Sequence, residues 1–123
     1  MEKIAGIGGF FFRSKDSNAL GKWYEKNFGI NSMDGSPEAK VWRQQEGPTV
    51  FAPFSLTTDY YPLEQHCMLN FRVHNMGAML KQLNENGVKI DEKRQEDSIG
   101  KFAWVYDPEG NKIELWEPSE ECK

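Results

Sequence analysis

An internal repeat constrains the fold of this chain more than any other feature of its sequence. The stretches IAGIGGFFFRSKD and CMLNFRVHN align so that Phe12-Arg13 corresponds to Phe71-Arg72 and Asp16 to Asn75. In each copy, an apolar segment typical of a strand leads to a residue suited to capping a helix. A chain that repeats such a unit is expected to fold as two similar modules.

A helix is predicted after each of these strands. In DSNALGKWYEKNFGI the apolar residues recur at helical spacing, and Gly29 is suited to ending the helix. MGAMLKQLNENGV has the same pattern, with Gly87 near its end. Further strands are predicted at KVWRQQ and TVFAPFSL in the first half, and from Lys101 to Tyr106 and from Asn111 to Glu117 in the second.

The ends of the two halves also correspond, since EGPTVF matches EGNKIE. The simplest interpretation is an α+β fold built from two tandem βαβββ modules. Module 1 covers about residues 1–57 and module 2 about residues 65–120, within a single domain of residues 1–123. TTDYYPLEQ is the predicted linker between the modules.

The composition excludes several classes of protein. With 123 residues, of which 38% are hydrophobic, the chain suits one compact domain. A net charge of −4 without a basic run argues against nucleic-acid binding. Neither a membrane span nor a signal pattern is found, so we expect a soluble, cytoplasmic protein. Cys67 and Cys122 have no CxxC spacing, which argues against a zinc knuckle or a disulfide scaffold.

Two segments resemble the vicinal oxygen chelate superfamily, which includes glyoxalase I, extradiol dioxygenases, fosfomycin-resistance transferases and bleomycin-resistance proteins. The more specific is DPEGNKIELWEP (Asp107 to Pro118), which resembles the closing hairpin of that family, and the other is the strand-Asp-helix start (Phe10 to Tyr24). The resemblance covers nearly the whole chain and implies an open, curved sheet around a pocket. It also implies a homodimer, because members commonly complete their pockets as homodimers. The fold hosts several chemistries, so function depends on the site.

The resemblance also implies where a metal would bind. The positions that hold ligands in metal-dependent members are occupied here by Gly9, Phe51, Met68 and Glu114. Glycine has no side chain, phenylalanine has no donor atom, and a thioether is a poor ligand for a hard divalent ion. We therefore predict no metal and no other cofactor. Two alternatives stay open: a displaced site formed by His66 with Glu114, and a glycine present only to allow close packing.

Strand alternation predicts which side chains line the pocket. Apolar Phe10, Phe12, Leu69 and Phe71 suit packing under the helices, which leaves the alternate residues of the same strands for the pocket. The predicted ligand-binding residues are Phe11, Arg13, Phe51, Met68, Asn70, Arg72, Trp104 and Trp116, with Glu114 as the candidate catalytic residue. Arg13 matches the position at which glyoxalase I holds an anionic substrate group. Pairing of either arginine with Glu114 is an equal alternative.

These residues favour a protein that binds a small aromatic or anionic molecule without a metal, as bleomycin-resistance proteins do by sequestration. The first alternative is a glyoxalase-like lyase or isomerase that uses Glu114 as general base, with Arg13 or Arg72 stabilising negative charge. The second alternative is a non-catalytic interaction subunit whose pocket has no ligand. The expected partners are a small molecule and a second copy of the chain, with no nucleic acid and no membrane.

Overall fold

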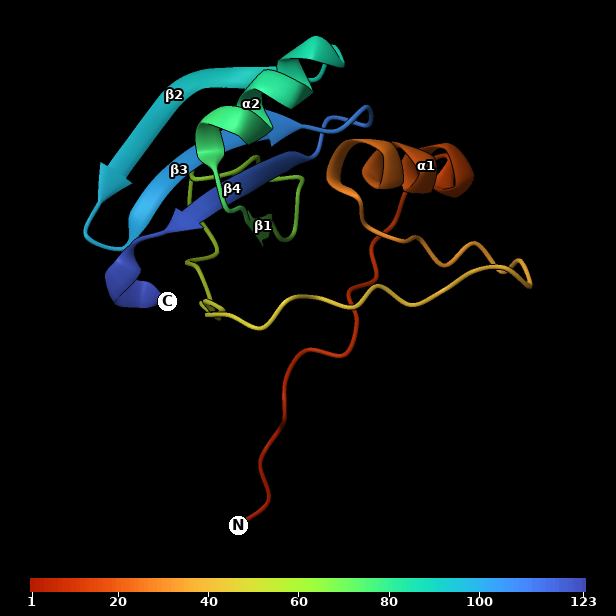
Figure 1. The fold of residues 1–123 in the computed structure, drawn as a ribbon, viewed down its shortest axis with the longest axis horizontal. Coiled ribbons are helices and arrows are strands. Elements are labelled where there is room, and N and C mark those ends of the chain that lie inside the picture. Colours follow the sequence, from red (N-terminus) through yellow and green to blue (C-terminus); the bar gives the residue numbers. More distant parts are fainter.

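The computed structural model describes all 123 residues and has an α+β fold, as predicted (Figure 1). Its elements are α1 (Ser17–Phe28), β1 (Leu69–Arg72), α2 (Met76–Glu85), β2 (Lys89–Asp97), β3 (Gly100–Tyr106), β4 (Lys112–Pro118) and a short 3-10 helix, η1 (Glu120–Cys122). Neither α-helix has the length and apolar character needed to cross a membrane.

The four strands form one open mixed sheet in the order β1-β4-β3-β2. β1 runs parallel to β4, whereas β3 is antiparallel to both of its neighbours. Asn70 of β1 and Trp104 of β3 lie on either side of Glu114 in β4. The register between β2 and β3 shifts between Ile90 and Arg94, which indicates a bulge.

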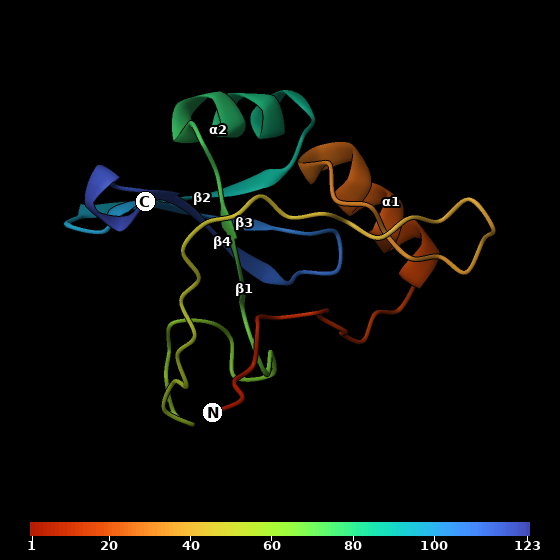
Figure 2. The same ribbon diagram turned by 60° about the horizontal axis from the view of Figure 1, so that its bottom comes forward.

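The hydrophobic core lies between this sheet and the helices. Alternate residues of β3 and β4 point toward it, among them the fully buried Val105 and Leu115. They pack with Leu83 of α2 and with Leu20 and Tyr24 of α1. Figure 2 shows α2 on one side of the sheet and the linker on the other. The linker therefore lies on the face that the helices do not cover.

Both helices begin where the repeated motif predicted a cap. Asp16 accepts a hydrogen bond from the Ala19 N–H at 3.0 Å, and Asn75 accepts one from the Ala78 N–H at 2.9 Å. α1 ends at Gly29, whose φ of 71° is the left-handed conformation that favours glycine. The two predicted helices, with their caps, are thus confirmed.

The DPEG turn between β3 and β4 fastens α1 to the second half of the chain. The Tyr24 hydroxyl donates to Asp107 Oδ2 at 2.8 Å, with both residues buried. In the same turn, the Glu109 carboxylate accepts from the backbone N–H groups of Lys15 at 2.7 Å and Asp16 at 3.1 Å. A negative charge at the start of α1 also suits the helix dipole.

The strands predicted in the first half are absent. Residues 4–13, KVWRQQ and TVFAPFSL have no strand pairing, and no backbone–backbone hydrogen bond involves residues 1–15 or 40–54. The physical reason is that a strand needs a hydrogen-bonded neighbour, and none lies beside these segments. Their apolar side chains are correspondingly exposed, to 93% at Phe11 and 85% at Phe51. The division into two βαβββ modules therefore stays a prediction.

Candidate functional site

The candidate site lies on the sheet face opposite the helices, which we call the linker face. β3 and β4 place Phe102, Trp104, Glu114 and Trp116 on this face, while the intervening residues enter the core. Phe102 lies opposite Trp116 in the register, and Trp104 opposite Glu114. The pairing of the two strands thus places a carboxylate among aromatic rings.

Glu114 is 7% exposed and accepts hydrogen bonds from three neutral groups. Its Oε1 accepts from Asn70 Nδ2 at 2.6 Å, and its Oε2 accepts from Trp104 Nε1 at 3.0 Å and from the Tyr60 hydroxyl. These charge-assisted bonds offset the cost of burying the carboxylate. No cation pairs with it, since the ion pairs of the structure are Lys81–Glu85, Lys101–Glu117 and Lys123–Glu120.

Tyr60 is the one donor to Glu114 that comes from the linker. Its ring lies edge-on to Trp104 with 6.1 Å between centroids, and Lys112 Nζ donates to its backbone carbonyl at 2.8 Å. Burial, reinforced by the bond to Glu114, raises the pKa of the Tyr60 hydroxyl, so this residue stays a neutral donor. Tyr60 was not among the residues predicted from the sequence, because no side-chain role was assigned to the linker. The adjacent tyrosines of TTDYYPLEQ were the available signal.

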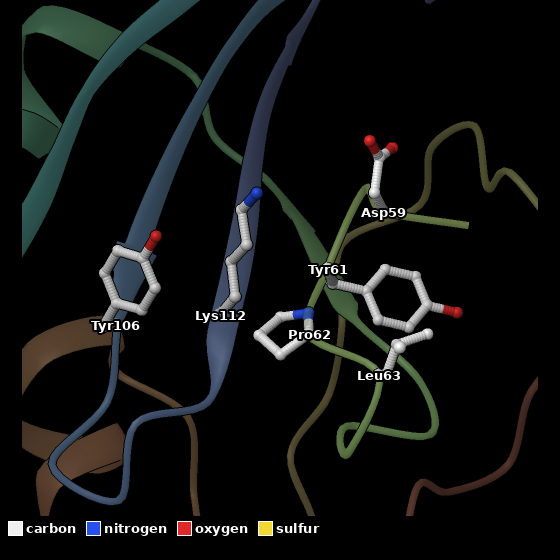
Figure 3. Close-up of a pocket in the computed structure, with 6 residues that line it drawn as sticks. All are labelled: Asp59, Tyr61, Pro62, Leu63, Tyr106 and Lys112. Atoms are coloured by element: carbon white, nitrogen blue, oxygen red, sulfur yellow. The ribbon is translucent and has the colours of Figure 1, made fainter. Parts of the chain in front are cut away.

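A cavity of about 340 Å³ lies beside this cluster, between the linker and the sheet (Figure 3). It is lined by Asp59, Tyr61, Pro62, Leu63, Tyr106 and Lys112. Figure 3 shows Tyr106 and Lys112 on neighbouring strands, facing the linker residues. Lys112 Nζ lies 5.5 Å from the centre of the Tyr60 ring, so one side chain borders both the cavity and the Glu114 cluster.

Four of the predicted ligand-binding residues lie around Glu114. Asn70 and Trp104 donate to it, and Met68 packs against the cluster formed by Phe102, Trp104 and Trp116. The Trp116 ring lies parallel to Phe102, with 6.3 Å between centroids. Its Nε1 donates to the Ile99 carbonyl at 2.9 Å, so Trp116 acts here as a wall rather than as a donor to the site.

The other four predicted residues lie apart from Glu114. Phe11, Arg13 and Phe51 are exposed. Arg72 Nη1 donates to the Pro48 carbonyl at 2.6 Å and Nη2 to the Gln45 carbonyl at 2.7 Å. The alternative that Arg13 or Arg72 pairs with Glu114 is therefore wrong for this structure. The Glu114 carboxylate accepts hydrogen bonds from neutral donors instead.

The residues present do not fit the metal of the metal-dependent members. No group of three or more His, Cys, Asp or Glu side chains lies close enough together to hold an ion. Gly9, Phe51 and Met68 offer no hard donor at the remaining ligand positions. His66 is exposed, and both oxygens of Glu114 already accept hydrogen bonds, so the displaced His66–Glu114 site has no support from the geometry.

Comparison with known proteins places the chain in a family. Among solved structures, it is similar to TnmS3, an antibiotic binding protein from Streptomyces sp. CB03234, with 20% identity, a TM-score of 0.67, and coverage of 97% of this chain and 100% of that one. It is also similar to a protein from the mobile metagenome of V. Pseudocholerae, with 22% identity, a TM-score of 0.60, and coverage of 98% and 99%.

A third similar structure is a superfamily member from Sphaerobacter thermophilus DSM 20745, with 16% identity, a TM-score of 0.57, and coverage of 93% and 98%. At these identities the likeness concerns the fold. No curated protein matches the chain. The sequence model of the Glyoxalase/Bleomycin resistance protein/Dioxygenase superfamily matches residues 6–115. Since this match spans most of the sequence, the chain belongs to the Glyoxalase/Bleomycin resistance protein/Dioxygenase superfamily.

Proposed function

We propose that this protein binds a small aromatic molecule on the linker face and carries out no chemical step on it. The observation that carries the proposal is the Glu114 cluster, a buried carboxylate with neutral donors, enclosed by Tyr60, Trp104 and Trp116. Apolar walls with a few placed polar groups are typical of small-molecule sites. An open depression of about 340 Å³ lies beside the cluster, lined by linker and sheet residues.

The similar structure TnmS3 is described as an antibiotic binding protein, and capture of a small molecule by this chain is consistent with that use of the fold. An antibiotic as the ligand here is not implied by 20% identity. The ligand class has to come from the residues of this chain.

The lyase or isomerase alternative has less support from the geometry. A general base needs a free lone pair directed at the substrate and a group that stabilises the resulting negative charge. In this structure neither predicted arginine is placed to stabilise such a charge, since Arg72 is engaged by backbone carbonyls and Arg13 is exposed. Binding of a small molecule does not require a group that stabilises a developing negative charge, so the same residues suit binding better than catalysis.

We also propose that a second copy of the chain covers the exposed apolar side chains of module 1. Asn70 lies opposite Glu114 in the β1–β4 pair, and the internal repeat makes Phe11 and Phe51 the corresponding residues of module 1. Both are exposed in segments without backbone hydrogen-bond partners. Unpaired apolar segments of this kind associate with other chains, and a symmetric dimer is the commonest closed assembly.

Light scattering at micromolar concentration tests the dimer. The expected mass is twice that of the 14.2 kDa chain. Phe51→Lys should lower it to one chain, because a charge would replace a side chain in the apolar contact. Met33→Lys is a matched control at another exposed apolar position, 64% exposed, and should leave the dimer intact. A monomer mass for the unaltered protein contradicts the proposal.

The binding function itself is tested in two steps. Protein purified without a polyhistidine tag is denatured, and the released small molecules are identified by mass spectrometry. Tryptophan fluorescence is then titrated with a panel of unrelated planar aromatic compounds, because Trp104 and Trp116 lie at the site. Saturable quenching by at least one compound is expected. No released molecule together with no saturable quenching would contradict the function.

A further inference from the structure

Glu114 accepts hydrogen bonds from two strand residues and from one residue of the linker. Asn70 and Trp104 are held in place by the β1–β4 and β3–β4 ladders. Tyr60 is on the linker, which has no helix or strand, and it is only partly buried. The backbone of Tyr60 makes two hydrogen bonds, from its own N–H to Thr58 Oγ1 at 3.2 Å and from Lys112 Nζ to its carbonyl at 2.8 Å, and neither belongs to a helix or a strand ladder. A segment with so few backbone bonds opens at lower cost than a strand.

The Tyr60 side chain indicates which kind of chemical group fits between Glu114, Trp104 and Lys112. It is a neutral phenol whose hydroxyl donates to Glu114 Oε2 and whose ring meets the Trp104 ring edge-on at 75°. Lys112 Nζ lies 5.5 Å from the centre of the ring, at the distance of a cation–π contact. An acceptor, an aromatic wall and a cation are thus arranged around one phenol.

We propose that this position is a binding site for hydroxylated aromatic molecules, that Tyr60 occupies it in the free protein, and that the ligand takes the place of Tyr60. The ligand hydroxyl donates to Glu114 Oε2, and its ring lies against Trp104. This assignment rests on the proposed binding function and names the class of ligand.

Charge and space both favour this class. Glu114 Oε2 accepts the Tyr60 hydroxyl and has no ion-pair partner, so the ligand group that meets it has to be a hydrogen-bond donor, which an anionic oxygen is not. Burial and Glu114 raise the pKa of Tyr60, and the same surroundings keep a bound phenol neutral. Withdrawal of the Tyr60 ring opens the cluster toward the cavity of about 340 Å³, because Lys112 borders both.

Gln65 keeps the far end of the linker attached while Tyr60 moves. Its Nε2 donates to the Lys112 carbonyl at 2.9 Å, and its Oε1 accepts from the Lys112 N–H at 2.9 Å. This amide pairs with the first residue of β4 as another strand would. The withdrawal of Tyr60 therefore involves the residues before Gln65 and leaves the sheet unchanged.

The test uses 2-naphthol and its methyl ether, 2-methoxynaphthalene, which have the same rings but differ in the ability to donate a hydrogen bond. Affinities are measured by isothermal titration calorimetry near neutral pH. Tyr60→Ala should bind 2-naphthol at least about ten-fold more tightly than the unaltered protein, because no side chain then competes. The same variant should prefer 2-naphthol over the ether by roughly ten-fold or more, as expected for a hydrogen bond to a charged acceptor.

Three further variants separate the contributions. Tyr60→Phe keeps the competing ring and loses its hydroxyl, so its gain should lie between those of the unaltered protein and Tyr60→Ala. Glu114→Gln in the Tyr60→Ala background should remove most of the preference for 2-naphthol. Leu56→Ala shortens a side chain that is 94% exposed, four residues before Tyr60 and outside the lining of the cavity, and should not produce a preference. Circular dichroism of each variant confirms that it is folded.

Two results overturn the assignment, and they differ in what they mean for the proposed function. Equal affinities of Tyr60→Ala for the two naphthalenes would refute the phenol site while leaving aromatic binding intact. Binding of neither compound to any variant would refute the phenol site, and the fluorescence titration with the aromatic panel would then decide the proposed function by itself.

Discussion

The hydrogen bond between Tyr24 and Asp107 should be a main support of α1, and Tyr24→Phe measures its contribution. The substitution keeps the ring, which packs in the core, and removes only the hydroxyl that donates to Asp107 Oδ2 at 2.8 Å. Tyr24 is 7% exposed and Asp107 4%, so water cannot easily replace the lost donor. A hydrogen bond to a charged group contributes about 1.5–3 kcal/mol to stability.

The structure narrows that range. After the substitution, Asp107 Oδ2 still accepts from Asn111 Nδ2 at 2.7 Å, and Oδ1 still accepts from the N–H groups of Glu109 and Asn111. Since the Asp107 carboxylate keeps these donors, Tyr24→Phe should lower the free energy of unfolding by about 1.5–2 kcal/mol, near the lower end of that range. For a chain of this size, the melting temperature should fall by about 5–12 °C.

Urea denaturation and thermal melts give the two quantities, and Tyr106→Phe is the matched control. The Tyr106 hydroxyl makes the same kind of bond, to Asp91 Oδ2 at 2.9 Å, but at a partly exposed position where water can take its place. Tyr106→Phe should therefore lower the free energy of unfolding by less than about 1 kcal/mol. A Tyr24→Phe protein no less stable than the Tyr106→Phe protein would refute the assignment of a structural role to this bond.

Three other outcomes are expected. Burial is the largest cause, and a hydrogen-bonded carboxylate the second, that raises the pKa of Tyr24, Tyr60 and Tyr106 above the unfolded value of about 10. The contribution of these hydroxyls to folding stability is therefore present below about pH 10 and is lost at higher pH. Urea titrations from neutral to alkaline pH should show stability falling there, and constant stability would contradict this. Gly100→Ala should lower the free energy of unfolding by roughly 2–4 kcal/mol, because φ is 142° and a Cβ would overlap the backbone oxygen of Glu117 in β4. An unchanged melting temperature would count against that backbone conformation. Arg13→Ala should change stability by less than about 0.5 kcal/mol, and a sharp loss in thermal melts would show that Arg13 has a buried partner after all.

The second half of the chain could be predicted from sequence because its signals are local. Helix caps, apolar periodicity and the DPEG turn each specify a short segment, and the structure has α1, α2, β1, β3 and β4 where these signals place them. β2 was not assigned because KIDEKRQED is charged, and its side chains are largely exposed. Only its backbone pairing with β3 makes it a strand.

The first half shows the limit of the same reasoning. Apolar content and strand propensity predicted strands at residues 4–13 and around Phe51, yet the structure has extended chain without pairing there. A strand is a property of two neighbouring segments, and a propensity read along one segment cannot supply the second. The repeat predicts which segments resemble each other, but it does not predict whether module 1 completes its sheet within one chain or with a second copy.

The last hairpin carries two buried carboxylates, and their surroundings explain why only one is a candidate for function. Asp107 accepts hydrogen bonds from its own tight turn between β3 and β4 and from Tyr24 in α1. Glu114 lies on the opposite face of the sheet from the helices and shares its carboxylate between two strand residues and the linker residue Tyr60. Removal of a donor to Asp107 should lower the stability of the fold. Removal of Tyr60 leaves Glu114 Oε2 as a hydrogen-bond acceptor beside the Trp104 ring. Both residues lie in the single motif DPEGNKIELWEP, so the motif alone does not distinguish them. The distinction depends on the donors, since one donor to Glu114 comes from the linker and none to Asp107 does.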